Sequence, residues 1–590
     1  MSVIALDFET YFSREYSLRK LTTEAYVRDS RFECLCLGLK PNQKTPAKAG
    51  RIKSHQLKIL SRVGVIAHHA HFDGLILNEH FGVKPAFWFD TLSMARLVYP
   101  HDKSHSLESL ADKFNLTPKS VPYDLFINKH WEGLDINTQN LLLQGCAHDV
   151  DLTYNIFKRL LPLVPKEELK LIDLTVRLFT EPVLELDQER VKKYADELLE
   201  RQEKLLISLG VNKKDLSSND KFAKILEGFG VEPPTKISPR TGKTTYAFAK
   251  TDQAFVDMLD GEDESLSLLC QARLSAKSTI GETRAFRLIH MSQRGNLPVY
   301  LKYYGAHTGR WSGGDKLNFQ NFPKEGELRK SILAPEGYVL VVLDLSQIEC
   351  RMLCYLAGEQ WALDAFAQGK DLYCDMASSV YGRIITKQDK TERFLGKTLV
   401  LGAGFGVGWK KLQNVLKLNK IYLTDDEAKR AIQSYRHKNP NIVQFWRHAD
   451  WVIERMYKND ETPYNWGPVI VKGRSIYLPN GACLDYSSLG RDSEGYYLDT
   501  PRGKTKLYGG KLTENVVQAL ARIVLSQAML KISKLYRICL TTHDELVYLA
   551  PLDEADMAYE IGLNILKSSP DWCRNIPLEA EGGYDVRYSK

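Results

Sequence analysis

Two adjacent carboxylates stand in an otherwise apolar segment near the C-terminus. In CLTTHDELVYLA, residues 539–550, apolar and β-branched residues that favour strands surround Asp544 and Glu545. A carboxylate buried without a partner is costly, so this pair needs a physical reason. Consecutive side chains of a strand point to opposite faces, so one pocket receives only one of them unless the backbone turns. A hairpin tip at THDE would provide that turn.

A third acid ends another apolar segment. Residues 338–344, YVLVVLD, form a continuous apolar run, typical of a buried strand that presents a carboxylate at its end. Asp344 is therefore the natural partner of Asp544. The alternative is that Asp544 and Glu545 are ordinary turn acids, which are common.

The N-terminal region carries a second set of acids. Asp7 and Glu9 are two apart on a predicted strand, so both face the same side and repel unless a cation lies between them. Hard oxygen ligands of this kind suit magnesium or manganese. For these two residues alone, an exposed strand with solvated acids is the better explanation.

Two more acids of the same region change that balance. AHHAHFDGLIL places Asp73 at a strand-to-helix junction, and CAHDVDLTYNIF places Asp149 on a helix. One domain would then supply four acids, which could hold two metal ions. Two metals a few ångström apart are the usual device for hydrolysing a phosphodiester.

A predicted helix combines a basic end with an apolar end. Arg393 and Lys397 are spaced i, i+4 and share one face, and Leu401 and Phe405 continue that stripe. Such a face suits a nucleoside triphosphate, with the phosphates on the cations and the base and sugar on the apolar part. A helix with a solvated basic end and a buried tail is the alternative.

The elements that must position these residues differ along the chain. Residues 1 to about 160 alternate strand-like and helix-like runs, which predicts an α/β domain, and a charged, leucine-rich helical region follows. Residues 231–250 are predicted to form a loop, because Pro, Ser, Thr and Gly are frequent there. Its Lys236, Arg240 and Lys243 fit a solvated loop and a phosphate-contacting loop about equally well.

Composition excludes several classes of protein. The chain has 590 residues, 44% of them hydrophobic and 26% charged, which indicates several globular domains. The net charge of +7 permits a nucleic-acid partner without arguing for one. The 10 cysteines include no CxxC pair, and we expect neither a signal peptide nor a membrane span, because the N-terminus is acidic and no apolar stretch approaches about 20 residues. We therefore expect a protein of the cytoplasm, either of a cell or of a host.

Several motifs, in order, resemble those of family A DNA polymerases. DLSQIECR, residues 344–351, is similar to the palm motif D-Y-S-Q-I-E-L-R, and HDE, residues 543–545, matches the third motif. RFLGKTLVLGAGFG resembles the fingers helix, TGRWSGGDKLNFQNFP resembles T-G-R-L-S-S…N-L-Q-N-I-P, and YGGKLTENVVQALAR resembles the segment before the third motif, especially in phage enzymes. The four N-terminal acids match the DEDD 3′→5′ exonuclease motifs.

The resemblance implies a fold and a division of the chain. It implies an α/β, RNase H-like exonuclease domain and an α+β polymerase domain with a right-hand palm, fingers and thumb. The expected bounds are 1–165 for the exonuclease, 166–590 for the polymerase, about 180–295 for the thumb, about 296–355 and 480–590 for the palm, and about 356–479 for the fingers.

The resemblance also implies an activity, which is DNA-templated extension of a primer with proofreading, in phage genome replication. Two metal ions per site, Mg²⁺ with Mn²⁺ as a substitute, would be held by Asp344 and Asp544 in the polymerase and by the four N-terminal acids in the exonuclease. The carbonyl of Leu345 is a further expected ligand. Glu545 is expected to be a secondary residue near the primer terminus.

Roles for other residues follow from the same resemblance. Glu349 is similar to the steric gate that excludes a ribose 2′-hydroxyl. The expected nucleotide-binding residues are Arg393, Lys397, Leu401, Phe405, Glu349, Gln347 and His543. The expected DNA contacts are Arg310, Gln320, Asn321 and Gln518 in the minor groove, with Lys236, Arg240 and Lys243 on phosphates.

Some positions depart from the family. Leu401 stands where the family has Phe or Tyr, so we expect a different tolerance of dideoxynucleotides. His69 replaces an Asn of the second exonuclease motif. Gly145 replaces the Tyr that orients the attacking water, so that group is missing or comes from elsewhere, with His148 and Tyr154 as candidates.

Two other functions compete with this interpretation. A single-subunit RNA polymerase shares the palm, but Glu349 and the exonuclease domain argue against it. A non-catalytic nucleic-acid clamp is disfavoured by the complete carboxylate set, because acids without metals weaken binding to phosphates. The expected partners are primer-template DNA and deoxynucleoside triphosphates. We expect a monomer with no membrane contact, and replisome or processivity partners stay open.

Overall fold

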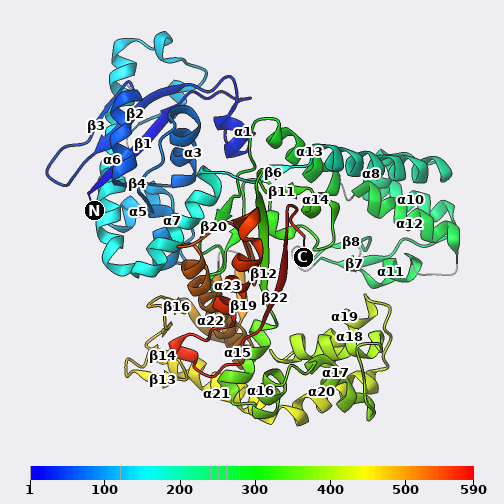
Figure 1. Cartoon of the computed structure of the whole chain (residues 1–590). Helices are drawn as coiled ribbons and strands as arrows, with labels where there is room; N and C mark the ends of the chain where they lie inside the picture. Colours follow the sequence, from blue (N-terminus) through cyan, green and yellow to red (C-terminus); the bar gives the residue numbers. More distant parts are fainter. Residues whose placement is uncertain are drawn as a thin grey trace.

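The computed structural model of the chain describes residues 2–52, 54–119, 121–238, 242–249, 251–259, 263–277, 280–500 and 503–589. Arg240, one of the expected DNA contacts, lies outside them. Figure 1 shows an N-terminal α/β body at the upper left, a helical arm at the upper right and a helical body below, around a central sheet. The predicted α/β fold and the α+β fold that follows it are both confirmed.

The N-terminal body is built on a five-stranded sheet in the order β3–β2–β1–β4–β5. Its strands are β1 (Val3–Thr10), β2 (Cys34–Lys40), β3 (Lys48–Gly50), β4 (Gly64–Ala67) and β5 (Phe87–Asp90). β1 is central, antiparallel to β2 and parallel to β4. All of β4 is buried, as expected for a parallel strand covered on both faces.

Two helices bring further residues to β1. Helix α3 (Ala70–Phe81) follows β4 after a tight turn, in which His69 adopts a left-handed conformation with φ 72°. Helix α6 (Ile136–Leu160) packs on β1 and β2. Asp135 caps α6 by accepting hydrogen bonds from the backbone N–H groups of Asn137 and Thr138.

Helix α7 (Lys166–Thr180) joins the two halves of the chain. It packs against α3 and β5 on the N-terminal body, and also against α22 (Gly509–Ile532) and β20 (Arg537–Thr542). The Trp88 N–H donates to Asp173 at 2.8 Å, and Arg177 Nη2 donates to the carbonyl of Pro85 at 2.8 Å. The expected domain boundary at 165/166 therefore falls before a helix that is hydrogen-bonded to the N-terminal body.

The central sheet has the order β20–β21–β12–β22 and is antiparallel throughout. β12 (Tyr338–Leu345) and β21 (Glu545–Pro551) are its inner strands, and β22 (Ala580–Asp585) lies at one edge. Residues 339–343 of β12 are buried, because both edges are paired and helix α23 (Ala555–Lys567) packs on the strand. The predicted apolar strand ending in Asp344 is therefore present.

The helical arm has a small core of its own. Helices α8 (Gln188–Ser208), α10 (Asn219–Gly228), α12 (Glu264–Lys277) and α13 (Ile280–Ser292) form most of it. Phe222, Phe255 and Leu269 are buried within its core.

The prediction of a loop over residues 231–250 is wrong in part. Strands β7 (Thr235–Ile237) and β8 (Thr244–Tyr246) pair as an antiparallel hairpin. Thr, Ile and Tyr favour paired strands, and this preference outweighed the polar composition. The hairpin is closed by the Ser238 N–H, which donates to the carbonyl of Lys243 at 2.9 Å.

The lower body is helical from α16 (Gln360–Ala367) to α21 (Pro440–Tyr457). A four-stranded sheet follows, β13–β14–β15–β16, from Tyr464–Trp466 to Cys483–Asp485. The expected division between fingers and palm at 479/480 falls inside this sheet, between β15 (Ser475–Tyr477) and β16. The sheet is one hydrogen-bonded unit, so that boundary does not correspond to a structural one.

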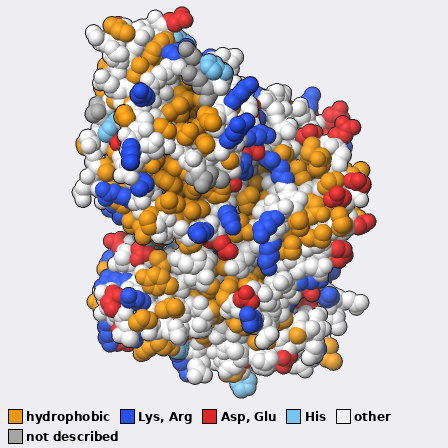
Figure 2. Space-filling view, turned by 60° about the vertical axis from the view of Figure 1, so that its left-hand side comes forward, with side chains coloured by type: hydrophobic (Ala, Val, Ile, Leu, Met, Phe, Trp, Pro, Cys, Tyr) orange, Lys and Arg blue, Asp and Glu red, His pale blue; other side chains and the backbone are white. Residues whose placement is uncertain are grey.

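The surface and the cysteines agree with the composition. Figure 2 shows Lys and Arg interspersed with apolar side chains over one face, while many Asp and Glu lie along its right-hand edge. All ten cysteines are free thiols. Within the described residues, no helix has both the length and the apolar character needed to cross a bilayer.

Candidate active sites

The turn between β20 and β21 brings two acids to the end of the central sheet. His543 and Asp544 form the turn, with His543 in a left-handed conformation at φ 54°. Leu345 donates its backbone N–H to the carbonyl of Asp544 at 3.0 Å, so the tip is held against the end of β12. Asp344 lies opposite Glu545 in the sheet register. The charge of Asp344 also acts on the carboxyl group of Asp544, so these two acids lie close together at the hairpin tip.

Charges around these two acids compensate one another. Lys324 Nζ lies 2.8 Å from Asp344 Oδ2, and Arg310 Nη2 lies 3.9 Å from Asp544 Oδ1. The pKa of Asp544 is raised to about 6, chiefly by burial, with Glu349 and Asp344 adding like charge against the effect of Arg310. Two neighbouring carboxylates that attract cations fit a divalent metal. The side chain of Leu345 is buried, so only its carbonyl could be a further ligand.

Glu545 has a different environment from Asp544. Its carboxylate is buried, 2.7 Å from Arg329 Nη2, and it also accepts a hydrogen bond from the hydroxyl of Tyr588. Side chains alternate along β21, so Glu545 points into the interior once Asp544 faces the tip. Glu545 thus forms a buried ion pair, and its expected place near the primer terminus stays a prediction.

A cavity of about 430 Å³ lies beside the predicted nucleotide helix. Lys397, Leu401 and Phe405 line it together with Tyr508. Helix α18 (Lys390–Thr398) continues into a π-helical turn (Leu399–Ala403), and such turns are frequent at functional sites. Arg393 forms an ion pair with Asp371 at 2.8 Å.

Gln347, Glu349 and His543 lie near the two acids. Gln347 precedes helix α15 (Ile348–Ala357) with φ 54°, and its Oε1 is buried without a hydrogen-bond partner among the described residues. Glu349 forms an ion pair with Arg310. The pKa of His543 is lowered by burial and by Arg310.

The expected DNA contacts fall into two groups. Gln320 is buried and donates to the carbonyl of Thr541 at 3.3 Å, and Gln518 accepts from Thr308 at 3.4 Å. These residues and Arg310 lie near the central hairpin, and Asn321 is exposed beside them. Lys236 and Lys243 lie on the β7–β8 hairpin.

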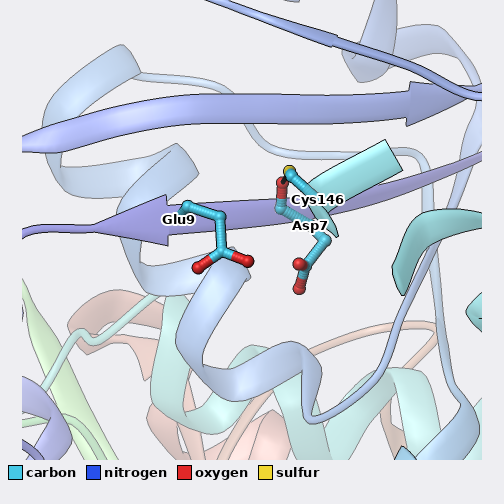
Figure 3. A group of neighbouring side chains, drawn as sticks. All are labelled: Asp7, Glu9 and Cys146. Carbon is cyan, nitrogen blue, oxygen red and sulfur yellow. Dashed lines mark hydrogen bonds between the residues drawn. The ribbon is translucent and has the colours of Figure 1, made fainter. Parts of the chain in front are cut away.

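Four carboxylates gather at the second candidate site. Asp7 and Glu9 project from the same side of β1 (Figure 3), Asp73 lies in the first turn of α3, and Asp149 lies on α6. Asp73 also accepts a hydrogen bond from the Phe8 N–H at 3.2 Å. Ligand atoms of Asp7, Glu9 and Cys146 lie within 4.8 Å of one another. The sequence-predicted acids therefore converge.

The electrostatics of this site favour a bound cation. Burial and the charge of Asp149 raise the pKa of Asp7 to about 7, and burial and Asp7 raise that of Glu9 to about 8. Burial raises the pKa of Asp73 well above its usual range. Crowded carboxylates of this kind fit hard divalent cations such as Mg²⁺ or Mn²⁺.

Besides Cys146, two residues at this site were missed by sequence reasoning. Lys119 Nζ lies 2.5 Å from Asp149 Oδ2, and the Tyr123 hydroxyl lies 2.8 Å from Glu9 Oε1 and 2.8 Å from Asp149 Oδ2. Both come from the irregular segment before α6, where neither periodicity nor motif spacing marks them.

His148 and Tyr154, the candidates for orienting the attacking water, make their contacts away from the four carboxylates. His148 Nε2 is 3.2 Å from the carbonyl of Pro118, and Tyr154 is buried in the core with Lys40 over its ring. In the described part of the chain, neither has a hydrogen bond to the four carboxylates. His69 donates its backbone N–H to Asp90 at 2.8 Å, and its ring nitrogen lies 2.8 Å from the hydroxyl of Tyr300.

A cavity of about 620 Å³ adjoins Glu9 and Tyr123. Aromatic and basic side chains line it, including Phe12, Phe72 and Arg14. Aromatic rings and cations together suit single-stranded nucleic acid, because bases stack and phosphates pair with cations.

Two stretches of the chain match known families. Residues 1–165 match the profile described as "3'-5' exonuclease", and residues 185–464 match "DNA polymerase family A".

Individual relatives are distant. A DNA polymerase of Bacillus phage SP02 is 26% identical over 343 residues, which cover 49% of this chain and 52% of the relative. The thermostable DNA polymerase I of Thermus filiformis is 26% identical over 479 residues, covering 77% and 52%. The chain thus spans about half the length of these curated relatives.

One solved structure shares the fold over nearly the whole chain. It is described as "POL domain of Pol1 from M. smegmatis complex with DNA primer-template and dNTP". The TM-score is 0.65 at 18% identity, with 99% of this chain and 95% of that chain covered.

Proposed function

Because the chain belongs to family A of the DNA polymerases and carries an N-terminal 3′-5′ exonuclease domain, we propose that it copies DNA and proofreads it. It would extend a primer with deoxynucleoside triphosphates on a DNA template and remove nucleotides from 3′ ends. The observation that carries the proposal is the meeting of Asp344 and Asp544 at the end of the central sheet.

The proposed cofactor is Mg²⁺, two ions per site, with Mn²⁺ as a substitute. Asp344, Asp544 and the carbonyl of Leu345 would hold it in one site, and Asp7, Glu9, Asp73 and Asp149 in the other. When bound, these ions activate the attacking oxygen and neutralise the charge that develops on the phosphate.

The protein residues would position the incoming nucleotide. Lys397 would pair with its phosphates, while Leu401 and Phe405 would hold the base and sugar in the cavity that the three residues line. Arg393 would reach the phosphates once its ion pair with Asp371 opens. Glu349, held by Arg310, would exclude a ribose 2′-hydroxyl.

The DNA would lie along the same surface. Arg310, Gln320, Asn321 and Gln518 would contact the minor groove, whose acceptors are common to all base pairs, and so check pair geometry without reading sequence. We further propose that the protein acts as a monomer in the cytoplasm, and in phage genome replication, which the Bacillus phage relative supports.

One labelled primer-template tests both activities. With Mg²⁺ we expect extension, and 3′ degradation when nucleotides are omitted; Asp344→Ala or Asp544→Ala abolishes extension, and Asp7→Ala abolishes degradation. Each variant is the control for the other activity, because the two sites lie in different parts of the fold. Glu545→Gln should keep measurable extension, since its carboxylate faces Arg329.

Two results would count against the proposal. Full extension by Asp344→Ala would show that the carboxylate pair is not the polymerase centre. Preference for ribonucleoside over deoxynucleoside triphosphates would favour an RNA polymerase.

A further inference from the structure

The Tyr123 hydroxyl lies between carboxylates that come from two different elements. It is 2.8 Å from Glu9 on β1 and 2.8 Å from Asp149 on α6. A hydroxyl carries one proton, so it cannot donate fully to both oxygens at once. The Tyr123 hydroxyl can therefore also form a hydrogen bond to a further group that Glu9 and Asp149 both bind.

The backbone that carries Tyr123 is anchored on its C-terminal side. Tyr123 begins the short helix η2 (Tyr123–Phe126), in which Phe126 is 1% exposed. Shortly beyond it, the Asn128 N–H donates to the carbonyl of Phe12 at 2.8 Å, and Tyr11 donates its hydroxyl to the Asn128 side chain at 2.9 Å. The position of the hydroxyl is thus fixed by packing.

Gly145 makes room for this segment. A Cβ at residue 145 would collide with Cγ2 of Val121 and lie 3.0 Å from its Cβ. The segment can approach Asp149 as closely as it does only because helix α6 has no side chain there. Gly145 and Tyr123 are therefore linked. Helix α6 has no side chain at residue 145, and the segment that passes over this position supplies the side chain of Tyr123 instead.

We propose that Tyr123 is the residue that orients the attacking water in the exonuclease site. This inference rests on the proposed exonuclease function. The water oxygen forms a bond to the terminal phosphorus, the bond from phosphorus to the preceding 3′ oxygen breaks, and that oxygen takes a proton. The product is a nucleoside 5′-monophosphate, and Tyr123 serves only as a hydrogen-bond partner of the water.

Tyr123→Phe tests the proposal, because it removes one oxygen and keeps the ring. We expect kcat for degradation of a single-stranded oligonucleotide to fall by about ten- to hundredfold, the effect of one lost hydrogen bond to a charged centre. KM and primer extension should stay unchanged. Tyr154→Phe is the matched control on α6 and should degrade DNA at the wild-type rate. A wild-type rate in Tyr123→Phe overturns the proposal.

A second pair of variants tests the role of Gly145. Gly145→Ala should slow degradation by displacing Val121, and the double variant Gly145→Ala/Val121→Ala should recover part of the rate. Wild-type degradation by Gly145→Ala would overturn the linkage between the glycine and the tyrosine.

Metal binding gives a readout independent of turnover. In an Asp344→Ala/Asp544→Ala background, Mn²⁺ binding followed by electron paramagnetic resonance reports the exonuclease site. Tyr123→Phe should bind Mn²⁺ as the background does, and Asp149→Ala should lose binding. Loss of Mn²⁺ in Tyr123→Phe would mean that the tyrosine supports the ligands, which overturns the proposed role. If the wild-type protein shows no metal-dependent degradation, the proposed exonuclease function itself fails, and this inference falls with it.

Discussion

Asp544 and Glu545 are neighbours in the chain with opposite surroundings. Asp544 stands at a turn, partly exposed and close to Asp344, whereas Glu545 is 2% exposed and paired with Arg329. Strand alternation separates the two side chains once the turn is placed before Glu545. Adjacent acids of one motif therefore differ in environment, the first at a partly exposed turn and the second in a buried ion pair.

The carboxylates of the second site make stability depend on pH when metal is absent. Asp7 and Glu9 have folded pKa values of about 7 and about 8, above their ordinary values of 3.8 and 4.5. The folded state then binds more protons than the unfolded state between these limits, so the free energy of unfolding falls as pH rises through this window. We expect the melting temperature in EDTA, relative to an Asp7→Asn/Glu9→Gln variant, to be lower at pH about 8 than at pH about 5.

The same comparison includes its own control. Mg²⁺ added at the higher pH should raise the melting temperature of the wild-type protein more than that of the variant, which keeps only the proposed site at Asp344 and Asp544, because a ligand stabilises only the state that binds it. A difference between the two proteins that does not vary with pH would contradict the assignment of the shifted pKa values.

At the scale of elements, one buried acid of helix α7, Glu168, ties this helix to the second half of the chain. Glu168 lies 2.7 Å from Arg522 Nη1 on α22 and 2.6 Å from Asn480 Nδ2, and it accepts a hydrogen bond from Tyr303. Burial opposes its charge, but Arg522, Tyr303 and Asn480 together hold the pKa of Glu168 below its usual range. One carboxylate thus fixes α7 against three separate segments.

Removal of this carboxylate should be strongly destabilising. Glu168→Ala leaves Arg522 buried without its partner, and we expect a loss of about 3–5 kcal/mol in urea unfolding. Glu167→Ala, the exposed neighbour on α7, should change stability by less than about 0.5 kcal/mol. Equal effects of the two variants would show that the ion pair does not hold the helix.

At the scale of the whole molecule, positive and negative charges nearly balance. The formal net charge of +7 is small for 590 residues, so any steering of DNA depends on local groups of Lys and Arg. On the β7–β8 hairpin, Lys243 is exposed to solvent, while Lys236 is paired with Asp252 at 2.5 Å. Of the two, Lys243 is the more available for a phosphate.

The hairpin either contacts phosphates of the DNA or is only solvated. The salt dependence of primer-template binding distinguishes these two interpretations. If Lys243 contacts phosphate, Lys243→Ala should reduce the slope of log affinity against log salt by about 1. Lys236→Ala should have a smaller effect because its charge is already compensated. An unchanged slope in Lys243→Ala would support a solvated hairpin.

The sequence by itself determined which acids are candidates for the two sites and which strands carry them. The apolar run before Asp344, the β-branched residues around Asp544 and the two-residue spacing of Asp7 and Glu9 are local patterns, and backbone periodicity alone translates them into strands and faces. The α/β class of the first domain followed from the alternation of strand-like and helix-like runs, whereas the α+β class of the second was implied by the resemblance to family A DNA polymerases. Composition was a weaker guide, because it predicted a loop where β7 and β8 pair.

Only the tertiary structure decided which side chains from unrelated segments meet. Tyr123 lies 26 residues from Asp149 and 114 from Glu9, and no local pattern relates the three. The partners of Glu545 and Glu168 are equally remote in the chain. Periodicity specifies the face on which a residue lies, but the contact across that face depends on how whole elements pack. Space left by a single glycine, Gly145, can therefore decide which tyrosine reaches an active site.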